Sequence, residues 1–418
     1  MAGDSWSTKT FGECAILIRD TVHPEYAQGL PYIGLEHITE RQLTLNSYGF
    51  AEDVTSIKSR FRKGDILFGK LRPYFRKVIL APFDGVCSTD IWVVRANSGI
   101  HQRFLFYWMA SQDFIEEATR TSEGTKMPRA QWEYVERLER FIPPFPEQCA
   151  IAHILGTLDD KIELNRRMNE TLEAMARVLF KSWFIDFDPV RAKMEGRNPD
   201  LPKEIADLFP DSFQESELGR VPKGWRVGTI GGEFNLTMGQ SPPGKTYNEI
   251  GEGISFYQGR ADFCFRYPNR RVFCTSPTRF ANHGDTLVSV RAPVGDINLA
   301  MEKCCIGRGV AAIRHKSNSR SYTYNAMHSL SNVFRDFEAE GTVFGCINKY
   351  DFHSIKYIAP PPQLVDKFEA TAFPIDQSIE NNILQSASLA TIREALLPKL
   401  LSGEIHIKAA EKLVGSIQ

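Results

Sequence analysis

Residues 148–184 contain a heptad pattern that constrains the fold of this chain more than any other feature. Apolar or small residues recur there in steps of three and four over four heptads, which predicts the contact face of a coiled-coil helix. This first seam consists of Leu155, Leu158, Ile162, Asn165, Asn169, Leu172, Ala176, Leu179 and Trp183. Because its stripe is narrow and the other faces are charged, the helix needs a partner helix.

A second copy of the pattern supplies a partner within the same chain. Shifting the first seam by 217 residues places it on a run with the same spacing and a polar middle. This second seam consists of Ile375, Ile379, Asn382, Ser386, Leu389, Arg393, Leu396 and Leu400. Asn165 and Asn382 coincide under the shift, and a polar seam residue fixes register. We expect the two helices to pair antiparallel with each other. Packing in a core or dimerisation is the alternative for either helix taken alone.

The globular parts of the chain also repeat, at low identity and with an offset near 220 residues. Trp6 matches Trp225, Pro73 matches Pro293, and residues 63–67 match residues 283–287. Short strand-like runs with turn signals precede each long helix. The sequence therefore predicts an α+β protein with an internal pseudo-two-fold repeat. Two β-rich globular domains would be separated by the helices, which pair as an antiparallel coiled coil and leave the domains at opposite ends.

These patterns predict six segments. They are a first globular domain at 1–146, a first long helix at 147–185, a surface linker at 186–219, a second globular domain at 220–362, a second long helix at 363–407 and a C-terminal tail at 408–418. Gly156-Thr157 and Phe373-Pro374 predict a break near the start of each helix. Pro398 predicts a kink near the end of the second helix.

Charge is balanced over the chain but not locally. The net charge is −1, from 50 basic and 51 acidic residues, so any nucleic-acid footprint must be local. Residues 56–77 form the most basic window, with eight basic residues, one acid and interleaved aromatic residues that include Tyr74 and Phe75. The basic residues of this window are Lys58, Arg60, Arg62, Lys63, Lys70, Arg72, Arg76 and Lys77. Such residues on strands and turns can contact phosphates and base edges.

The second half of the chain contains a corresponding cluster that is rich in arginine. It consists of Arg260, Arg266, Arg270, Arg271, Arg279 and Arg291. Arginine suits bidentate recognition of guanine better than lysine does. We therefore predict that both clusters bind DNA. The alternative for either cluster alone is a charged, solvated surface.

No catalytic or metal-binding pattern accompanies these clusters. The sequence lacks H-E-x-x-H, G-x-S-x-G and Rossmann fingerprints, so we expect no catalytic residues in this chain. The eight cysteines are scattered without zinc-like spacing, so we expect no metal site and a reducing, cytoplasmic environment. Neither a signal peptide nor a membrane-spanning run is evident in the sequence.

Three stretches carry a resemblance to a known family. Residues 143–200, residues 208–225 and the run LLPKLLSGEI at 396–405 resemble the specificity subunit of type I restriction-modification enzymes. The similarity extends over the whole chain and is strongest in the first helix and the linker. It is weak inside the two globular units, which would be the target recognition domains.

The resemblance implies a division of labour. Each recognition domain would read one half of a bipartite double-stranded DNA target, and the coiled coil would set the spacer. Two modification subunits would dock on the helices and use S-adenosylmethionine to methylate adenine. Restriction subunits would supply ATP- and Mg²⁺-dependent translocation and cleavage. This chain itself would bind no cofactor and catalyse nothing. A non-enzymatic coiled-coil adaptor with two protein-binding domains is the alternative.

Overall fold

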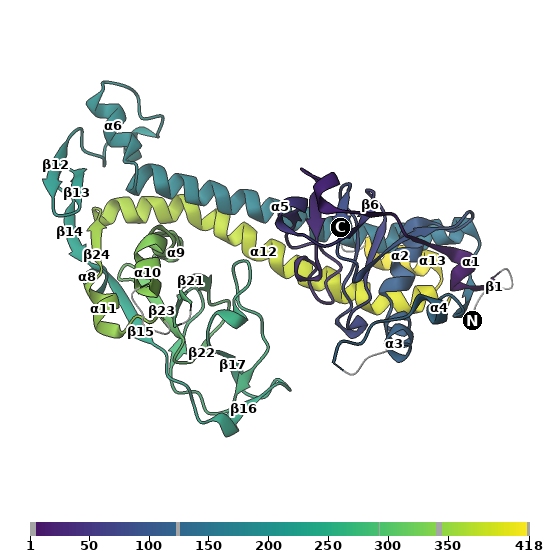
Figure 1. The fold of residues 1–418 in the computed structure, drawn as a ribbon. Coiled ribbons are helices and arrows are strands. Elements are labelled where there is room, and N and C mark those ends of the chain that lie inside the picture. The colour runs from purple at the N-terminus through teal and green to yellow at the C-terminus, as the bar shows by residue number, and fades with distance from the viewer. Residues whose placement is uncertain (1–5, 123–125, 292, 340–344, 416–418) are drawn as a thin grey trace. The chain divides into compact units, whose positions relative to one another are not determined.

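The structure is a computed structural model that describes residues 6–122, 126–291, 293–339 and 345–415 (Figure 1). The chain divides into two compact units. Unit 1 comprises Met1–Asn165 and Leu384–Gln418, and unit 2 comprises Arg166–Ile383. Both boundaries fall inside a long helix, so each unit holds one globular domain together with half of each long helix.

The two long helices carry the predicted seams. They are α5 at Phe145–Phe184 and α12 at Pro362–Leu401, each of 40 residues, and their halves lie side by side within each unit (Figure 1). In unit 1 the Asn165 amide donates to Ser386 Oγ at 3.2 Å, and in unit 2 the Asn382 amide donates to Asn169 Oδ1 at 2.9 Å. Residue numbers thus rise along one helix as they fall along the other. None of the seam residues is exposed. The burial of the seams and the direction given by the two hydrogen bonds together confirm the predicted antiparallel pair.

The predicted breaks in the two helices were wrong. Both helices run without interruption through Gly156 and Pro374. The second helix also continues past Pro398 to Leu401, and the kink expected at Pro398 stays a prediction. Gly156 has a packing role instead, because a Cβ there would lie 2.6 Å from the Arg103 guanidinium carbon. At Pro374 the helix loses a backbone donor, but Ala372 and Ile379 on either side are fully buried and hold it in place.

The described residues of the globular domain of unit 1 form three sheets. An antiparallel sheet has the order β2-β10-β7-β8, with bounds Ala15–Ile18, Ile91–Ala96, Ile66–Gly69 and Val78–Leu80. A mixed sheet has the order β3-β6-β9-β4-β5, with bounds Thr21–Val22, Lys58–Phe61, Gly85–Cys87, Pro31–Ile33 and Gly49–Phe50. Strands β1 at Ser7–Thr10 and β11 at Glu139–Ile142 form the third. The helices are α1 at Phe11–Cys14, α2 at Gln102–Ala110, α3 at Gln112–Arg120 and α4 at Trp132–Val135.

The globular domain of unit 2 has a closely related architecture. Its antiparallel sheet has the order β15-β23-β20-β21, with bounds Phe234–Met238, Val310–His315, Thr286–Val290 and Val294–Leu299. Its mixed sheet has the order β16-β18-β17-β22-β19, with bounds Tyr247–Asn248, Phe273–Cys274, Ile254–Tyr257, Cys304–Ile306 and Phe280–Ala281. Strands β14 at Arg226–Thr229 and β24 at Lys356–Ala359 pair as β1 and β11 do. The helices are α8 at Ile230–Glu233, α9 at Arg320–Ser329, α10 at Ser331–Ala339 and α11 at Lys349–Ser354.

The internal repeat predicted from the sequence extends to individual contacts. In each mixed sheet one strand pair is parallel, β4 with β9 and β17 with β22. In unit 1 the Arg95 guanidinium bonds Asp65 at 2.6 Å, and in unit 2 Arg314 bonds Asp285 at the same distance. Each acid lies between a positive-φ glycine, Gly64 or Gly284, and the first residue of a strand of the antiparallel sheet.

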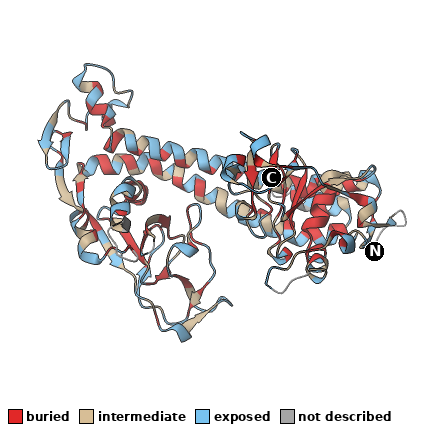
Figure 2. Cartoon of the chain, viewed as in Figure 1, coloured by how far each residue is buried: buried red, intermediate tan, exposed pale blue. Residues whose placement is uncertain are grey.

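The segment predicted as a linker contributes to the core of unit 2. It contains α6 at Asp188–Met194, α7 at Lys203–Ala206 and the hairpin β12–β13 at Phe213–Ser216 and Gly219–Pro222. Val190 and Phe209 from this segment are buried in one core cluster with Trp183 and Trp225. Figure 2 shows buried stretches, in red, within α6. The segment is therefore partly an element of the domain and not only a surface connection.

The C-terminal segment packs into unit 1. The second long helix ends at Leu401, six residues before the predicted bound at 407, and a separate helix, α13 at Ile407–Gly415, follows. Ala410 and Val414 of α13 are buried in the core of unit 1. The predicted tail at 408–418 is thus largely helical, and its residues 416–418 lie outside the described residues.

Candidate nucleic-acid interface

The structure divides the first basic cluster into exposed and buried members. Arg60, Arg62 and Lys63 are exposed on β6 and the turn that follows it, and Arg72 is exposed beside the short helix η4 at Pro73–Phe75. Lys70 and Lys77 are partly buried, and Lys77 Nζ donates to the Leu35 carbonyl at 2.8 Å. The exposed members have the position that a phosphate or base-edge contact requires.

The second cluster shows a similar division. Arg260, Arg270, Arg271, Arg279 and Arg291 are exposed. Three of these form ion pairs of 2.8–3.0 Å, Arg260 with Asp296, Arg270 with Glu302 and Arg271 with Asp262. Arg279 and Arg291 form no ion pair with any residue that the structure describes. Their guanidinium groups can accept an external anion without breaking a pair among these residues.

Three predicted DNA-binding residues are buried, which removes them from the candidate interface. Lys58 Nζ donates to the carbonyl and hydroxyl oxygens of Ser56, and burial lowers its pKa. Arg76 is buried against the Ala110 carbonyl and Glu394. The Arg266 side chain has no exposed surface. A charge window in a sequence contains no information on burial, because the partners of Arg76 and Arg266 lie in other segments of the chain.

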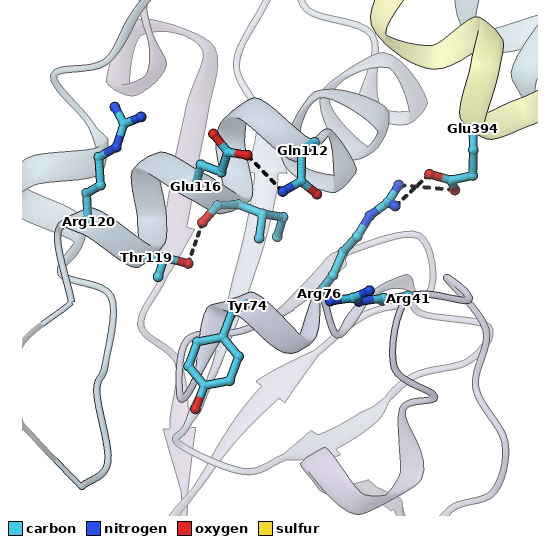
Figure 3. Close-up of a pocket in the computed structure, with 9 residues that line it drawn as sticks. Arg41, Tyr74, Arg76, Gln112, Glu116, Thr119, Arg120 and Glu394 are labelled. Carbon is cyan, nitrogen blue, oxygen red and sulfur yellow. Dashed lines mark hydrogen bonds and ion pairs between the residues drawn. The ribbon is translucent and has the colours of Figure 1, made fainter. Parts of the chain in front are cut away.

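In unit 1, Arg76 joins the globular domain to α12. Its guanidinium donates to both Glu394 oxygens, at 2.6 and 3.2 Å, and its Nε donates to the Ala110 carbonyl at 2.6 Å. Burial opposes ionisation of Glu394, but the Arg76 guanidinium holds the pKa of that carboxyl below its ordinary value. The pair lies beside an open cavity of about 720 Å³, also lined by Arg41, Tyr74 and Arg120, in which Arg76 points toward Glu394 (Figure 3).

A second set of contacts in unit 1 joins α2 to α5. Arg103 donates to Asp160 at 2.6 Å and to the Gly156 carbonyl at 3.1 Å. Tyr107 donates to Asp159 at 2.5 Å, and Arg393 of α12 bonds the other Asp159 oxygen at 2.5 Å. Burial and the neighbouring Asp159 raise the pKa of Tyr107, so its hydroxyl keeps the proton that it donates.

Unit 2 has a corresponding but denser cluster. Arg266 pairs with Glu173 of α5 and with Asp376 of α12, and all three side chains are buried. Arg320 of α9 donates to Glu380 of α12 at 2.7 Å and to Tyr267 Oη at 2.6 Å. Burial outweighs the Arg266 guanidinium at Asp376 and raises the pKa of that carboxyl.

These domain-to-helix contacts were not predicted from the sequence, although the repeat held a signal for them. The 217-residue shift that aligns the seams also aligns Arg103 with Arg320, Tyr107 with Tyr324 and Asp159 with Asp376. An arginine and a tyrosine four residues apart lie on the same face of a helix. Their recurrence opposite an acid that directly follows a seam residue indicates a docking face.

Two features are absent from the residues that the structure describes. These residues include no cluster of three His, Cys, Asp or Glu side chains that could hold a metal ion. Within the same ranges, no helix is both long enough and apolar enough to cross a membrane. The chemistry that the exposed clusters can perform is recognition of a polyanion.

Comparisons with known proteins find similarity to the specificity subunits of type I restriction enzymes. Residues 24–174 match a family described as the type I restriction modification DNA specificity domain. The putative type I restriction enzyme MjaX specificity subunit of Methanocaldococcus jannaschii is 28% identical, over 97% of this chain and 95% of its own. The type I restriction enzyme HindI specificity subunit of Haemophilus influenzae is 26% identical, over 83% of this chain and 88% of its own.

Similarity to a solved structure extends to the fold. The crystal structure of a type I restriction-modification S subunit from M. genitalium aligns with a TM-score of 0.55 at 18% identity, over 96% of this chain and 97% of that chain. The arrangement of two β-rich domains and two long helices is therefore one that has been observed experimentally.

Proposed function

We propose that this chain, which belongs to the family of type I restriction-modification specificity subunits, selects the DNA sequence on which such a complex acts. The resemblance read from the sequence is confirmed, and the adaptor alternative is not favoured. The family name describes a specificity component and not a catalytic one.

We propose further that each globular domain reads one half of a bipartite target. The observation that carries this proposal is the repeat, because two domains of related topology each present their own exposed basic residues. Arg60, Arg62, Lys63 and Arg72 would act in the first domain, and Arg279 and Arg291 in the second. Such side chains contact phosphates for affinity and base edges in the major groove for specificity.

The long helices would set the gap between the half-sites. Each extends over about 60 Å at 1.5 Å per residue, and the polar pairs Asn165–Ser386 and Asn169–Asn382 fix their register. Two modification subunits would dock on these helices and supply S-adenosylmethionine and adenine methylation. Restriction subunits would supply ATP- and Mg²⁺-dependent cleavage. All eight cysteines are free thiols, which supports the cytoplasmic location that we propose for the assembly.

Domain exchange tests this function. The chain is co-expressed with a cognate modification subunit, and methylated adenines are mapped across the genome. Replacing residues 1–146 with the corresponding domain of a relative should change one half of the methylated motif and leave the other half and the gap unchanged. The matched exchange of residues 220–362 should change the opposite half. A single exchange that rewrote both halves would overturn the modular assignment.

A paired insertion tests the role of the helices. One heptad is added after Met168 and another after Asn382, which lie at the same level and leave both polar pairs intact. The added length is about 10 Å, close to three base pairs. Both half-sites should remain with a longer gap. A folded, active insertion variant with an unchanged gap would show that other elements set the distance.

A further inference from the structure

The buried Arg266 of unit 2 connects three parts of the molecule that differ in role. Its guanidinium pairs with Glu173 on α5 and Asp376 on α12, while its backbone belongs to the loop between η6 at Arg260–Asp262 and β18. The side chain and that of Asp376 have no exposed surface, and that of Glu173 is 7% exposed. One side chain of the recognition domain thus contacts both long helices in a site without bulk water.

The packing around Arg266 restricts its orientation. The guanidinium lies over the Tyr324 ring of α9, 4.3 Å from the ring centroid, and the Arg266 carbonyl accepts from the Leu299 amide at 2.8 Å. The next residue, Tyr267, is held by Arg320, which also pairs with Glu380 of α12. A planar guanidinium that bonds two carboxylates and stacks on a ring fixes direction as well as distance.

The segment at 260–271, which comprises η6 and most of this loop, carries three of the exposed arginines, namely Arg260, Arg270 and Arg271. It is braced internally, because the Asn269 amide donates to the Asp262 carbonyl at 2.8 Å and Arg271 bonds the Asp262 carboxylate at 3.0 Å. A displacement at Arg266 therefore moves the exposed face of the loop with it.

We propose that Arg266 is a positioning residue that sets the phase of one DNA half-site relative to the other, by locking the loop at 260–271 onto the helix pair. This inference rests on the proposed function. One base pair corresponds to about 3.4 Å of rise and about 34° of rotation. A recognition loop freed from its three-way lock can reach half-sites one base pair nearer or farther.

The test uses a variant that removes the lock without leaving unpaired charge. Arg266→Met, Glu173→Gln and Asp376→Asn are combined, because replacing a whole buried ionic cluster perturbs stability less than removing one partner. The full-length protein with its modification subunits is incubated with a random duplex library, and the bound DNA is sequenced. The wild type should enrich one bipartite motif with one gap length. The triple variant should keep both half-sites. The fraction of bound sequences whose gap is one base pair longer or shorter should rise about tenfold.

Two further variants complete the design. Arg177→Met removes the other arginine paired with Glu173, at 3.0 Å and half-exposed, and should leave the gap distribution unchanged. Arg266→Lys retains the charge without the planar fork and should broaden the gap as the triple variant does, so it decides the matter if the triple variant does not fold.

The outcomes separate the two proposals. A wild-type protein that enriches no bipartite motif overturns the proposed function and this inference together. A wild type with a single gap, beside folded Arg266 variants with the same single gap, overturns the positioning role alone. Loss of the second half-site in a folded variant also overturns it, because Arg266 would then maintain the recognition surface and not its phase.

Discussion

In unit 1, Asp159 of α5 receives Arg393 from α12, whereas in unit 2 the equivalent Asp376 of α12 receives Arg266 from a loop of the globular domain. Ala176 occupies on α5 the place that Arg393 occupies on α12. The two units thus retain the acid but obtain the compensating charge from different segments. A buried carboxylate needs a cation nearby, and the energy does not depend on where in the chain that cation originates.

The source of the charge determines what the ion pair holds together. In unit 1 the pair between Arg393 and the partly buried Asp159 joins helix to helix, and the domain adds Arg76 to Glu394, whose side chain is 40% exposed. In unit 2 the buried pairs join the domain to both helices. The second domain is therefore attached through a drier and more directional contact than the first.

The largest expected effect is that of Arg266→Met. It leaves Glu173 and Asp376 without their buried cation and should lower the free energy of unfolding of unit 2 by about 3–5 kcal/mol. Urea titration followed by tryptophan fluorescence measures this change. Arg177→Met is the control and should lower it by at most about 0.5 kcal/mol. Similar losses for the two variants would contradict the difference between buried and exposed pairs.

Arg393→Met should have a smaller effect on unit 1. Asp159 keeps the Tyr107 hydroxyl and Glu394 keeps Arg76, so the expected loss is about 2–3 kcal/mol. The same titration applies. Combining Arg393→Met with Asp159→Asn should recover part of the loss, because the uncompensated charge is then absent. A double variant that is no more stable than Arg393→Met alone would contradict the idea that uncompensated charge on Asp159 causes the loss of stability.

DNA affinity distinguishes exposed arginines from buried ones. Arg62→Ala in unit 1 and Arg279→Ala in unit 2 should each weaken binding by about 1–3 kcal/mol if a base contact is lost, or flatten the salt dependence by about one ion if a phosphate contact is lost. Fluorescence anisotropy over a salt series measures both. The control is Arg197→Ala, since Arg197 is exposed and paired with Glu195 outside both clusters. Unchanged DNA affinity in both variants would indicate that the clusters are charged, solvated surface and do not bind DNA.

The smallest expected effect concerns acid. His328 of unit 2 corresponds to Ser111 of unit 1 under the 217-residue shift. Burial, helped by the charges of Arg177 and Arg266, lowers the pKa of His328 from 6.5 to about 3. As the pH falls below 6.5, the imidazole of the unfolded chain binds a proton, whereas that of the folded chain stays neutral until the pH approaches 3. Protonation therefore favours the unfolded state, and the folded protein loses stability over this pH range. From pH 7.5 to 5.5 the loss should be about 1 kcal/mol.

The variant His328→Ser tests this pH effect, because it places in unit 2 the residue that unit 1 already has. Urea midpoints at pH 7.5 and pH 5.5 should differ less in the variant than in the wild type. An equal difference in both proteins would assign the acid sensitivity to another group.

Much of the fold followed from the sequence because it rests on local periodicity. The seams, their antiparallel pairing and the repeated domains depend on residues a few positions apart, and these features were predicted. Arg266 shows where such reasoning ends. Its partners lie 93 and 110 residues away in the chain, so its exposed neighbours Arg270 and Arg271 made it appear to be a surface residue. Gly156 was misread for the same reason, since Arg103, whose guanidinium lies where a Cβ at residue 156 would meet it, is on another helix.

Unit 1 is built from two separated stretches of chain, and this has a consequence for synthesis on the ribosome. Leu389, Leu396 and Leu400 share a core with Phe104 and Leu155, yet the chain must first produce all of residues 166–383. At about 5–20 residues per second, that interval is roughly 10–40 s. Unit 2 is continuous and can fold as it emerges, whereas the apolar face that awaits Leu389 and Leu396 stays uncovered for that time. The part of the protein that is synthesised first is therefore the part that is completed last.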